Sequence, residues 1–79
     1  MENKSEELFA IEKNAGELLV IRDSTYRNHQ LIDVRVSFRD KAGDYHPTRK
    51  GICLGLELWT QILPEITKAI QQMKQATTA

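Results

Sequence analysis

The most regular pattern of apolar and polar positions in this chain runs from Leu31 to Phe38. One face of an extended segment is apolar there and the other is mixed: Ile32, Val34, Val36 and Phe38 against Leu31, Asp33, Arg35 and Ser37. A period of two predicts a strand with one buried face and one face open to a ligand.

A strand is also predicted upstream, by the apolar run Glu17–Arg22 that follows a turn signal at residues 14–16. The polar segment at 23–30 has the composition of a loop. Residues 1–13 lack good periodicity, and we interpret them as a flexible N-terminal tail.

Downstream of the alternating strand, residues 41–44 have the length and the glycine of a hairpin loop. Residues 45–46 then begin a returning strand, and Pro47, which cannot donate to a ladder, marks an edge or an irregular position. A separate short strand is predicted at 52–54, with Cys53 as a small core side chain. The pattern therefore predicts four strands.

The final third of the chain changes to a helical period. Apolar side chains recur at spacings that alternate between four and three: Trp59, Leu63, Ile66, Ile70 and Met73. This stripe predicts an amphipathic helix over about 56–75 with a frayed end at 76–79, and Pro64 predicts a kink or a break inside it. The stripe is longer than such a sheet can cover alone, so we expect its excess to form a contact between two copies of the chain.

Length and cysteine content narrow the class of protein. The 79 residues suffice for one small domain, whose thin stability margin a partner subunit would widen. One cysteine forbids an intrachain disulfide, and together with two histidines it is too little for a dedicated zinc site. Because no apolar stretch reaches the roughly 20 residues of a membrane span and the acidic start is unlike a secretory signal, we expect an intracellular protein, in the cytoplasm or nucleoid if it is prokaryotic or phage-encoded.

The formal net charge is zero, but the charge is unevenly distributed. Residues 1–20 carry five Glu against two Lys, residues 21–50 carry seven Lys or Arg against four Asp, and residues 51–79 balance. Five of the seven central cations are Arg, which suits planar phosphate contacts better than Lys. Composition alone slightly favours a solvated charged face over a face that binds a polyanion, but the local asymmetry in charge is the more useful clue.

The sequence shows no arrangement typical of an enzyme. It has no Gly-rich phosphate loop, no Ser or Cys beside an obvious base, and no cluster of metal ligands. His29 and His46 are separated by the strongest predicted strand, and the aspartates are dispersed along the chain. We therefore expect a protein without enzymatic activity, cofactor or metal.

Aromatic residues interleave the basic segment: Tyr26-Arg27, Phe38-Arg39, and Tyr45-His46 shortly before Arg49-Lys50. Cations that follow a backbone, with flat rings that stack on unpaired bases, are typical of proteins that bind single-stranded nucleic acid. Phe38 also continues the apolar face of its strand, so a core position and a stacking position are both open for it. Tyr26 lies in a polar loop, so contact of its ring with a ligand is favoured over a packing role.

Four motifs occur in one order: Ile21-Arg22-Asp23, Leu31-Ile32-Asp33-Val34-Arg35, Pro47-Thr48-Arg49-Lys50-Gly51-Ile52-Cys53-Leu54 and Glu57-Leu58-Trp59. Through them, residues 16–74 resemble the single-stranded-DNA-binding domain of the transcriptional coactivator positive cofactor four and its bacterial and phage relatives. The resemblance implies an α+β fold at residues 14–75: a four-stranded antiparallel twisted sheet followed by one C-terminal amphipathic helix, in a homodimer joined through the helices.

The resemblance also implies a set of nucleic-acid-binding residues, carried over by position: Arg22, Tyr26, Arg27, His29, Arg35, Phe38, His46, Arg49 and Lys50. It assigns the helix stripe that begins at Trp59 to the core and the dimer interface. The loop after Asp23 is longer here than in the family, and histidines stand at two cationic positions. We therefore expect DNA binding at pH 7 to be weaker than in a relative with lysines at these positions, and to become tighter as the pH falls through about 6.5.

Together these features predict a homodimer that binds single-stranded DNA with little sequence specificity, and the resemblance implies a role in transcription, replication or repair. Two alternatives stay open. A protein-interaction module that recruits a nucleic-acid-processing partner is supported by the neutral total charge and the surplus apolar helix surface. A single-stranded RNA ligand differs by its 2′-hydroxyl, which the sequence does not discriminate.

Overall fold

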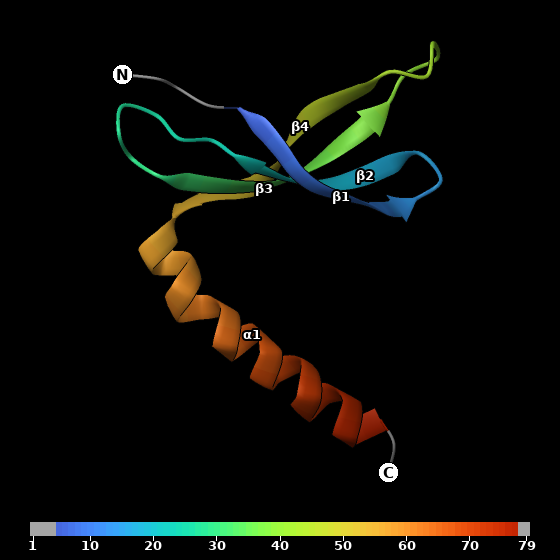
Figure 1. Ribbon diagram of the computed structural model, residues 1–79. Coiled ribbons are helices and arrows are strands. Elements are labelled where there is room, and N and C mark those ends of the chain that lie inside the picture. The colour runs from blue at the N-terminus through green and yellow to red at the C-terminus, as the bar shows by residue number, and fades with distance from the viewer. Residues whose placement is uncertain (1–4, 78–79) are drawn as a thin grey trace.

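The computed structural model describes residues 5–77 as one sheet followed by one helix (Figure 1). The elements are β1 (Glu6–Asn14), β2 (Glu17–Asp23), β3 (Leu31–Arg39), β4 (Tyr45–Gly55) and α1 (Leu56–Thr77). Each strand pairs antiparallel with its neighbour in sequence, in the order β1-β2-β3-β4. The predicted four-stranded antiparallel sheet with a C-terminal helix is confirmed. The ends of the predicted tail and frayed terminus, residues 1–4 and 78–79, lie outside the described residues.

β1 lies where the sequence predicted a flexible tail, and that prediction is wrong for residues 6–13. A two-residue turn connects β1 to β2, and the Asn14 side-chain oxygen accepts a hydrogen bond from the Gly16 N–H within it, at 3.0 Å. The β1–β2 register is irregular between Glu7 and Phe9. This irregularity interrupts the alternation of apolar and polar residues by which a strand is recognised.

β4 joins what the sequence predicted as two strands, at 45–46 and 52–54. Its pairing with β3 is irregular next to Val36, which faces residues 48–50 instead of a single residue. We call residues 48–50 the β4 bulge. A bulge keeps the chain in the sheet while its extra residues stay unpaired, so β4 continues past Pro47.

Gly51 lets β4 approach β3 closely, directly after the β4 bulge. A Cβ atom at this position would lie 2.6 Å from the Val34 carbonyl oxygen and 2.8 Å from the Arg35 Cα atom. Both of these atoms belong to the backbone and cannot move aside without distorting β3. A side chain at Gly51 would therefore push the two strands apart.

The β2–β3 hairpin extends beyond its strands to a tight tip. Tyr26 and His29 exchange two backbone hydrogen bonds, at 2.9 and 2.8 Å, and between them Arg27 and Asn28 have positive φ angles of 48° and 67°. Positive φ at both central residues is the conformation of a type I′ turn, whose twist matches that of paired strands. The segment predicted as a loop thus gives Tyr26, Arg27 and His29 defined positions.

α1 runs without a break through Pro64, so the predicted break does not occur. The start of the helix rests on the apolar face of the sheet, over a pocket lined by Ile21, Ile32, Val34, Trp59 and Leu63. Trp59 Nε1 donates a hydrogen bond to the Ile32 carbonyl oxygen at 2.9 Å. Figure 1 shows the rest of the helix projecting away from the sheet. No helix among the described residues is long and apolar enough to cross a membrane.

A single chain buries little apolar surface. Among the described residues, Val20 and Val36 are the buried apolar ones, at 2% and 7% exposure. The distal part of the helix stripe is open, with exposures between 46% and 68%: Leu63, Ile66, Ile70 and Met73. Cys53 is exposed as well, and the prediction of a core side chain is wrong because Cys53 pairs with Asp33 and so lies on the polar face of the sheet, opposite α1.

One carboxylate organises the loop between β3 and β4. Asp40 Oδ1 accepts hydrogen bonds from the backbone N–H groups of Ala42 and Asp44, both at 2.9 Å. Asp40 Oδ2 lies 2.6 Å from His46 Nε2. The bond with His46, and after it the bonds from the backbone, hold the pKa of Asp40 below its ordinary value of 3.8.

We expect Asp40→Asn to cause a small but measurable fall in the free energy of unfolding at pH 7. Because the folded-state pKa lies below 3.8, the stabilisation is complete above that pH and is lost as the pH falls through the folded-state value. Urea denaturation should separate wild type from the variant at pH 7 and bring them together at the acidic end of the titration. Asp44→Asn in the same loop is the matched control. A gap that stays constant into acid would show that ionisation of Asp40 is not its cause.

Candidate nucleic-acid interface

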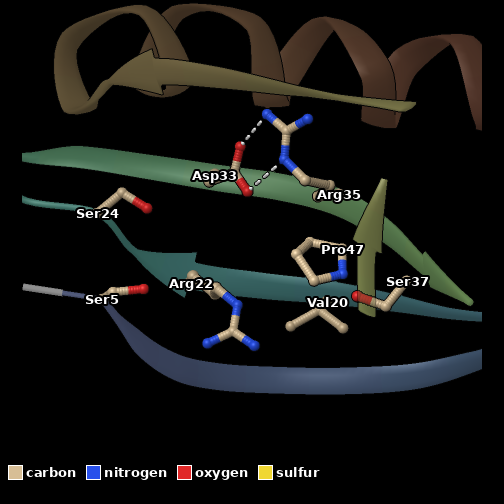
Figure 2. A pocket seen from close by; sticks show the side chains of 8 residues that line it. All are labelled: Ser5, Val20, Arg22, Ser24, Asp33, Arg35, Ser37 and Pro47. Atoms are coloured by element: carbon tan, nitrogen blue, oxygen red, sulfur yellow. Dashed lines mark hydrogen bonds and ion pairs between the residues drawn. The ribbon is translucent and has the colours of Figure 1, made fainter. Parts of the chain in front are cut away.

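The polar face of the sheet holds a pocket of about 410 Å³ (Figure 2). Its polar lining consists of two guanidinium groups, one carboxylate and three hydroxyl groups, from Arg22, Arg35, Asp33, Ser5, Ser24 and Ser37. These strand residues alternate with those beneath α1, so the pocket opens on the opposite face from the helix. Arginine and hydroxyl donors around a hollow suit an anionic group such as a phosphate. No group of three or more potential metal ligands occurs among the described residues.

Arg35 is held by the protein through three of its five N–H donors. Nε and Nη2 donate to the two carboxylate oxygens of Asp33, at 3.0 and 2.8 Å, as the dashed lines in Figure 2 show. Nη1 donates to the Thr48 carbonyl oxygen at 2.9 Å. The hydrogen bond with Asp33 raises the pKa of Arg35. Since Asp33 is only 7% exposed, the geometry of this ion pair is fixed by the sheet.

Arg22 is held more loosely. It faces Glu7 across the β1–β2 register, and its Nη2 lies 4.0 Å from Glu7 Oε1. A long ion pair between partly exposed groups is weak and is screened by salt. The acidic N-terminal segment thus contacts the polar face through Glu7, and the Arg22 charge stays available to an anion.

Tyr26, Arg27 and His29 lie at the tip of the β2–β3 hairpin. The Tyr26 side chain is 49% exposed, and the guanidinium carbon of Arg27 lies 5.2 Å from the centroid of its ring. This is the distance of a cation–π contact. An exposed ring and a cation therefore stand together at this tip, as stacking on an unpaired base beside a phosphate requires.

Phe38 and His46 form a second aromatic pair, near the opposite end of β3. They face one another across the β3–β4 register, with ring centroids 5.4 Å apart and an interplanar angle of 37°. Phe38 is 44% exposed, so of its two open positions the core is excluded. His46 Nε2 also contacts the Asp40 carboxylate, so its ring is held between Phe38 and the β3–β4 loop.

The β4 bulge carries the remaining predicted cations. Arg49 and Lys50 are exposed, and within residues 5–77 neither side chain makes a hydrogen bond or an ion pair. The backbone between them is fixed by Thr48, whose Oγ1 donates to the Val36 carbonyl oxygen at 2.7 Å and accepts from the Lys50 N–H at 3.1 Å. Both cations thus extend from an ordered piece of backbone.

The structure gathers the predicted site residues into separate groups instead of a single row. Arg22 and Arg35 share the polar pocket, whereas Phe38, three positions after Arg35, points by strand alternation to the other face of β3. The sequence reasoning missed Asp33 and Thr48, the partners of Arg35. The spacing of Asp33 and Arg35, two residues apart on one strand face, is the signal that could have found the first of them.

An open antiparallel sheet whose strands follow chain order, completed by one C-terminal helix, places the chain in the α+β class of proteins. The family model described as Transcriptional Coactivator p15 (PC4) matches residues 13–64, and the chain belongs to this family.

Solved structures of PC4 homologues agree with this assignment. The chain is similar to a homologue from Burkholderia pseudomallei K96243, with 30% identity and a TM-score of 0.76 over 84% of this chain and 97% of that chain in a tetragonal crystal form. The orthorhombic form gives 29% identity and the same TM-score of 0.76 over 87% and 93% of the two chains. A bacteriophage T5 homologue of the eukaryotic coactivator PC4, implicated in recombination-dependent DNA replication, shares the fold at 19% identity, with a TM-score of 0.52 over 100% of this chain and 99% of that chain.

Proposed function

We propose that this protein binds single-stranded DNA with little sequence specificity and without catalysis, as a homodimer. The observation that carries the proposal is the polar face of the sheet, where a pocket of about 410 Å³ holds two arginines. The exposed cations Arg49 and Lys50 of the β4 bulge add further positive charge. Membership of a family of transcription coactivator homologues supports it. A role in transcription, replication or repair follows from the same relationship.

Two kinds of contact account for binding in this proposal. Charge for the backbone phosphates comes from Arg22, Arg27, Arg49 and Lys50. Neutralising these phosphates releases counterions, and that release supplies most of the affinity. Tyr26 offers an exposed ring at the hairpin tip, and a base stacked on such a ring contributes about 1–3 kcal/mol. Phe38 is exposed too, but on the other face of the sheet. Neither kind of contact reads base identity, so specificity should be weak.

A second copy of the chain completes the fold in this proposal. Ile66, Ile70 and Met73 are exposed by 46%, 48% and 68% in one chain, although they continue the stripe that begins at Trp59. A domain of this size is marginally stable even with a well-filled core, and the described core of one chain is small. Helix stripes that cover one another in a homodimer would supply the missing burial.

The proposal is tested by fluorescence-anisotropy titration of a labelled 20-nucleotide oligo(dT) and of a duplex of equal length, at several salt concentrations. We expect the single strand to bind more tightly. Each neutralised phosphate contributes about −0.7 to the slope of log affinity against log salt, so four cations give a slope of about −2.8 and five, with Arg35 included, about −3.5. Equal affinity for the duplex, or affinity independent of salt, would contradict the proposal.

The apolar side chains of β1 support a second candidate, a protein-interaction module that recruits a nucleic-acid-processing partner. Leu8, Phe9 and Ile11 are each exposed by 54% or 55%, on the edge strand of the sheet. Absence of binding to oligo(dT), to the duplex and to poly(U) would favour this candidate. Preferential binding to poly(U) would instead identify single-stranded RNA as the ligand.

A further inference from the structure

A chain of hydrogen bonds runs from the buried carboxylate of Asp33 to the backbone of the β4 bulge. Asp33 accepts two N–H groups of Arg35, Arg35 donates to the Thr48 carbonyl oxygen at 2.9 Å, and Thr48 Oγ1 accepts the Lys50 N–H at 3.1 Å. Thr48 also donates to the Val36 carbonyl oxygen at 2.7 Å. The conformation of the bulge therefore depends on where one guanidinium group is held.

We propose that Asp33 is a positioning residue for nucleic-acid binding. Through Arg35 and Thr48 it sets the β4 bulge in the conformation that presents Arg49 and Lys50 to the phosphate backbone. This inference rests on the proposed function and deepens it, because it reassigns Arg35 from a phosphate ligand to a link between β3 and the bulge.

Burial and geometry favour positioning over the opposite role, in which the Asp33 carboxylate competes with phosphate for Arg35. Asp33 is 7% exposed, so a phosphate that took its place on Arg35 would leave a nearly buried carboxylate without a partner. Both of its oxygens are used, at 3.0 and 2.8 Å, which is the bidentate geometry in which an arginine is most strongly held. A buried ion pair of this kind is costly to break because the remaining charge loses its partner.

The close approach at Gly51 restricts the bulge further. A Cβ atom on Gly51 would lie 2.6 Å from the Val34 carbonyl oxygen and 2.8 Å from the Arg35 Cα atom. The end of the bulge is therefore pressed against β3 and cannot shift toward it. Its remaining freedom is the orientation of residues 48–50, which the bond from Arg35 to the Thr48 carbonyl oxygen fixes.

Positioning and competition predict opposite signs for Asp33→Asn. The variant removes one negative charge from a surface that meets a polyanion, so competition predicts tighter binding. Positioning predicts weaker binding, by about tenfold, the equivalent of one lost charge-assisted hydrogen bond. It also predicts a salt slope that is shallower by up to about 1.4, because Arg49 and Lys50 lose their phosphates.

The experiment compares Asp33→Asn with Thr48→Val and Asp44→Asn, using the oligo(dT) titration at two salt concentrations. Thr48→Val removes the Oγ1 link at nearly constant shape and unchanged charge, and it carries the test if Asp33→Asn does not fold. Asp44→Asn is the matched control, since it removes a carboxylate from the β3–β4 loop without touching the network. Circular dichroism shows that each chain is folded, and amide NMR of Lys50 and Gly51, recorded without DNA, reports on the bulge directly.

Weaker binding, a shallower salt slope and shifted Lys50 and Gly51 amides in both network variants, with Asp44→Asn no weaker than wild type, are the expected results. Equal or tighter binding by Asp33→Asn with unshifted amides would overturn the inference. A loss of stability alone would lower the unfolding midpoint but leave the salt slope of the folded protein unchanged, and this result too would overturn it. If wild type binds no oligo(dT), the proposed function fails, and the amide spectra still decide whether Asp33 sets the bulge.

Discussion

Replacing Ile66 and Ile70 with glutamate is expected to leave the chain largely unfolded. In one chain these side chains are 46% and 48% exposed, and charged substitutions at such surface positions ordinarily change stability by a few tenths of a kcal/mol. In the proposed homodimer they meet the helix of the second copy, where an unpaired carboxylate costs several kcal/mol. Since one chain buries only Val20 and Val36 among its described apolar residues, a chain without its partner should lose the fold as well.

Circular dichroism and sedimentation equilibrium measure the two parts of this result. The matched control is Gln71→Glu with Gln72→Glu, which adds the same charge to α1 away from the apolar stripe. That variant should remain dimeric, with the helical signal of wild type. A folded monomer of the Ile66 and Ile70 variant with an unchanged unfolding midpoint would remove α1 from the interface.

Arg49→Ala combined with Lys50→Ala should weaken binding to oligo(dT) by about 25-fold at 0.1 M salt. The estimate comes from two lost phosphate contacts, each of which contributes about 0.7 to the salt slope, so that the slope should fall from about −2.8 to about −1.4. The fold should be unaffected, because both side chains are exposed and make no hydrogen bond or ion pair within residues 5–77. The loss should be the same for every single-stranded sequence, since phosphate contacts carry no base information.

Lys68→Ala with Lys74→Ala gives the matching control, with the same change in net charge on the helix instead of the sheet. Anisotropy titrations of both double variants separate a local contact from a change in overall charge. Similar losses in the two would mean that the β4 bulge makes no specific contact and that binding responds only to the net charge of the protein.

The elements that the sequence predicted best have an uninterrupted period. β3 alternates along its whole length and α1 keeps a helical stripe, and both stand where they were expected. β1 and β4 were misread because each contains a register irregularity, near Phe9 in one and at residues 48–50 in the other. An irregularity breaks the alternation without ending the strand. Cys53 was misplaced because its apolar neighbours suggest burial, whereas its pairing with Asp33 places it on the polar face of the sheet.

For the candidate site, the sequence predicted residue types more readily than their partners. The exposure of Arg49, Lys50 and Tyr26 agrees with a ligand surface, and their contacts with DNA stay predictions. The role of Arg35 depends on a carbonyl oxygen thirteen residues away, on Thr48. A backbone acceptor has no signature in the sequence, so the contact between Arg35 and the Thr48 carbonyl oxygen is recognised only once the fold and its bulge are known.

The strand order of the sheet bears on how the chain folds. Because every strand pairs with its neighbour in sequence, the sheet consists of consecutive hairpins, and contacts this local form within microseconds to milliseconds. The distal turns of α1 lie away from the sheet and, in the proposed homodimer, are covered only when a second chain binds. The final step of folding is then bimolecular, and refolding should slow as the protein is diluted. A newly synthesised chain would form its hairpins before it reaches the native state, and the rate of the final step would depend on the concentration of other copies of the chain.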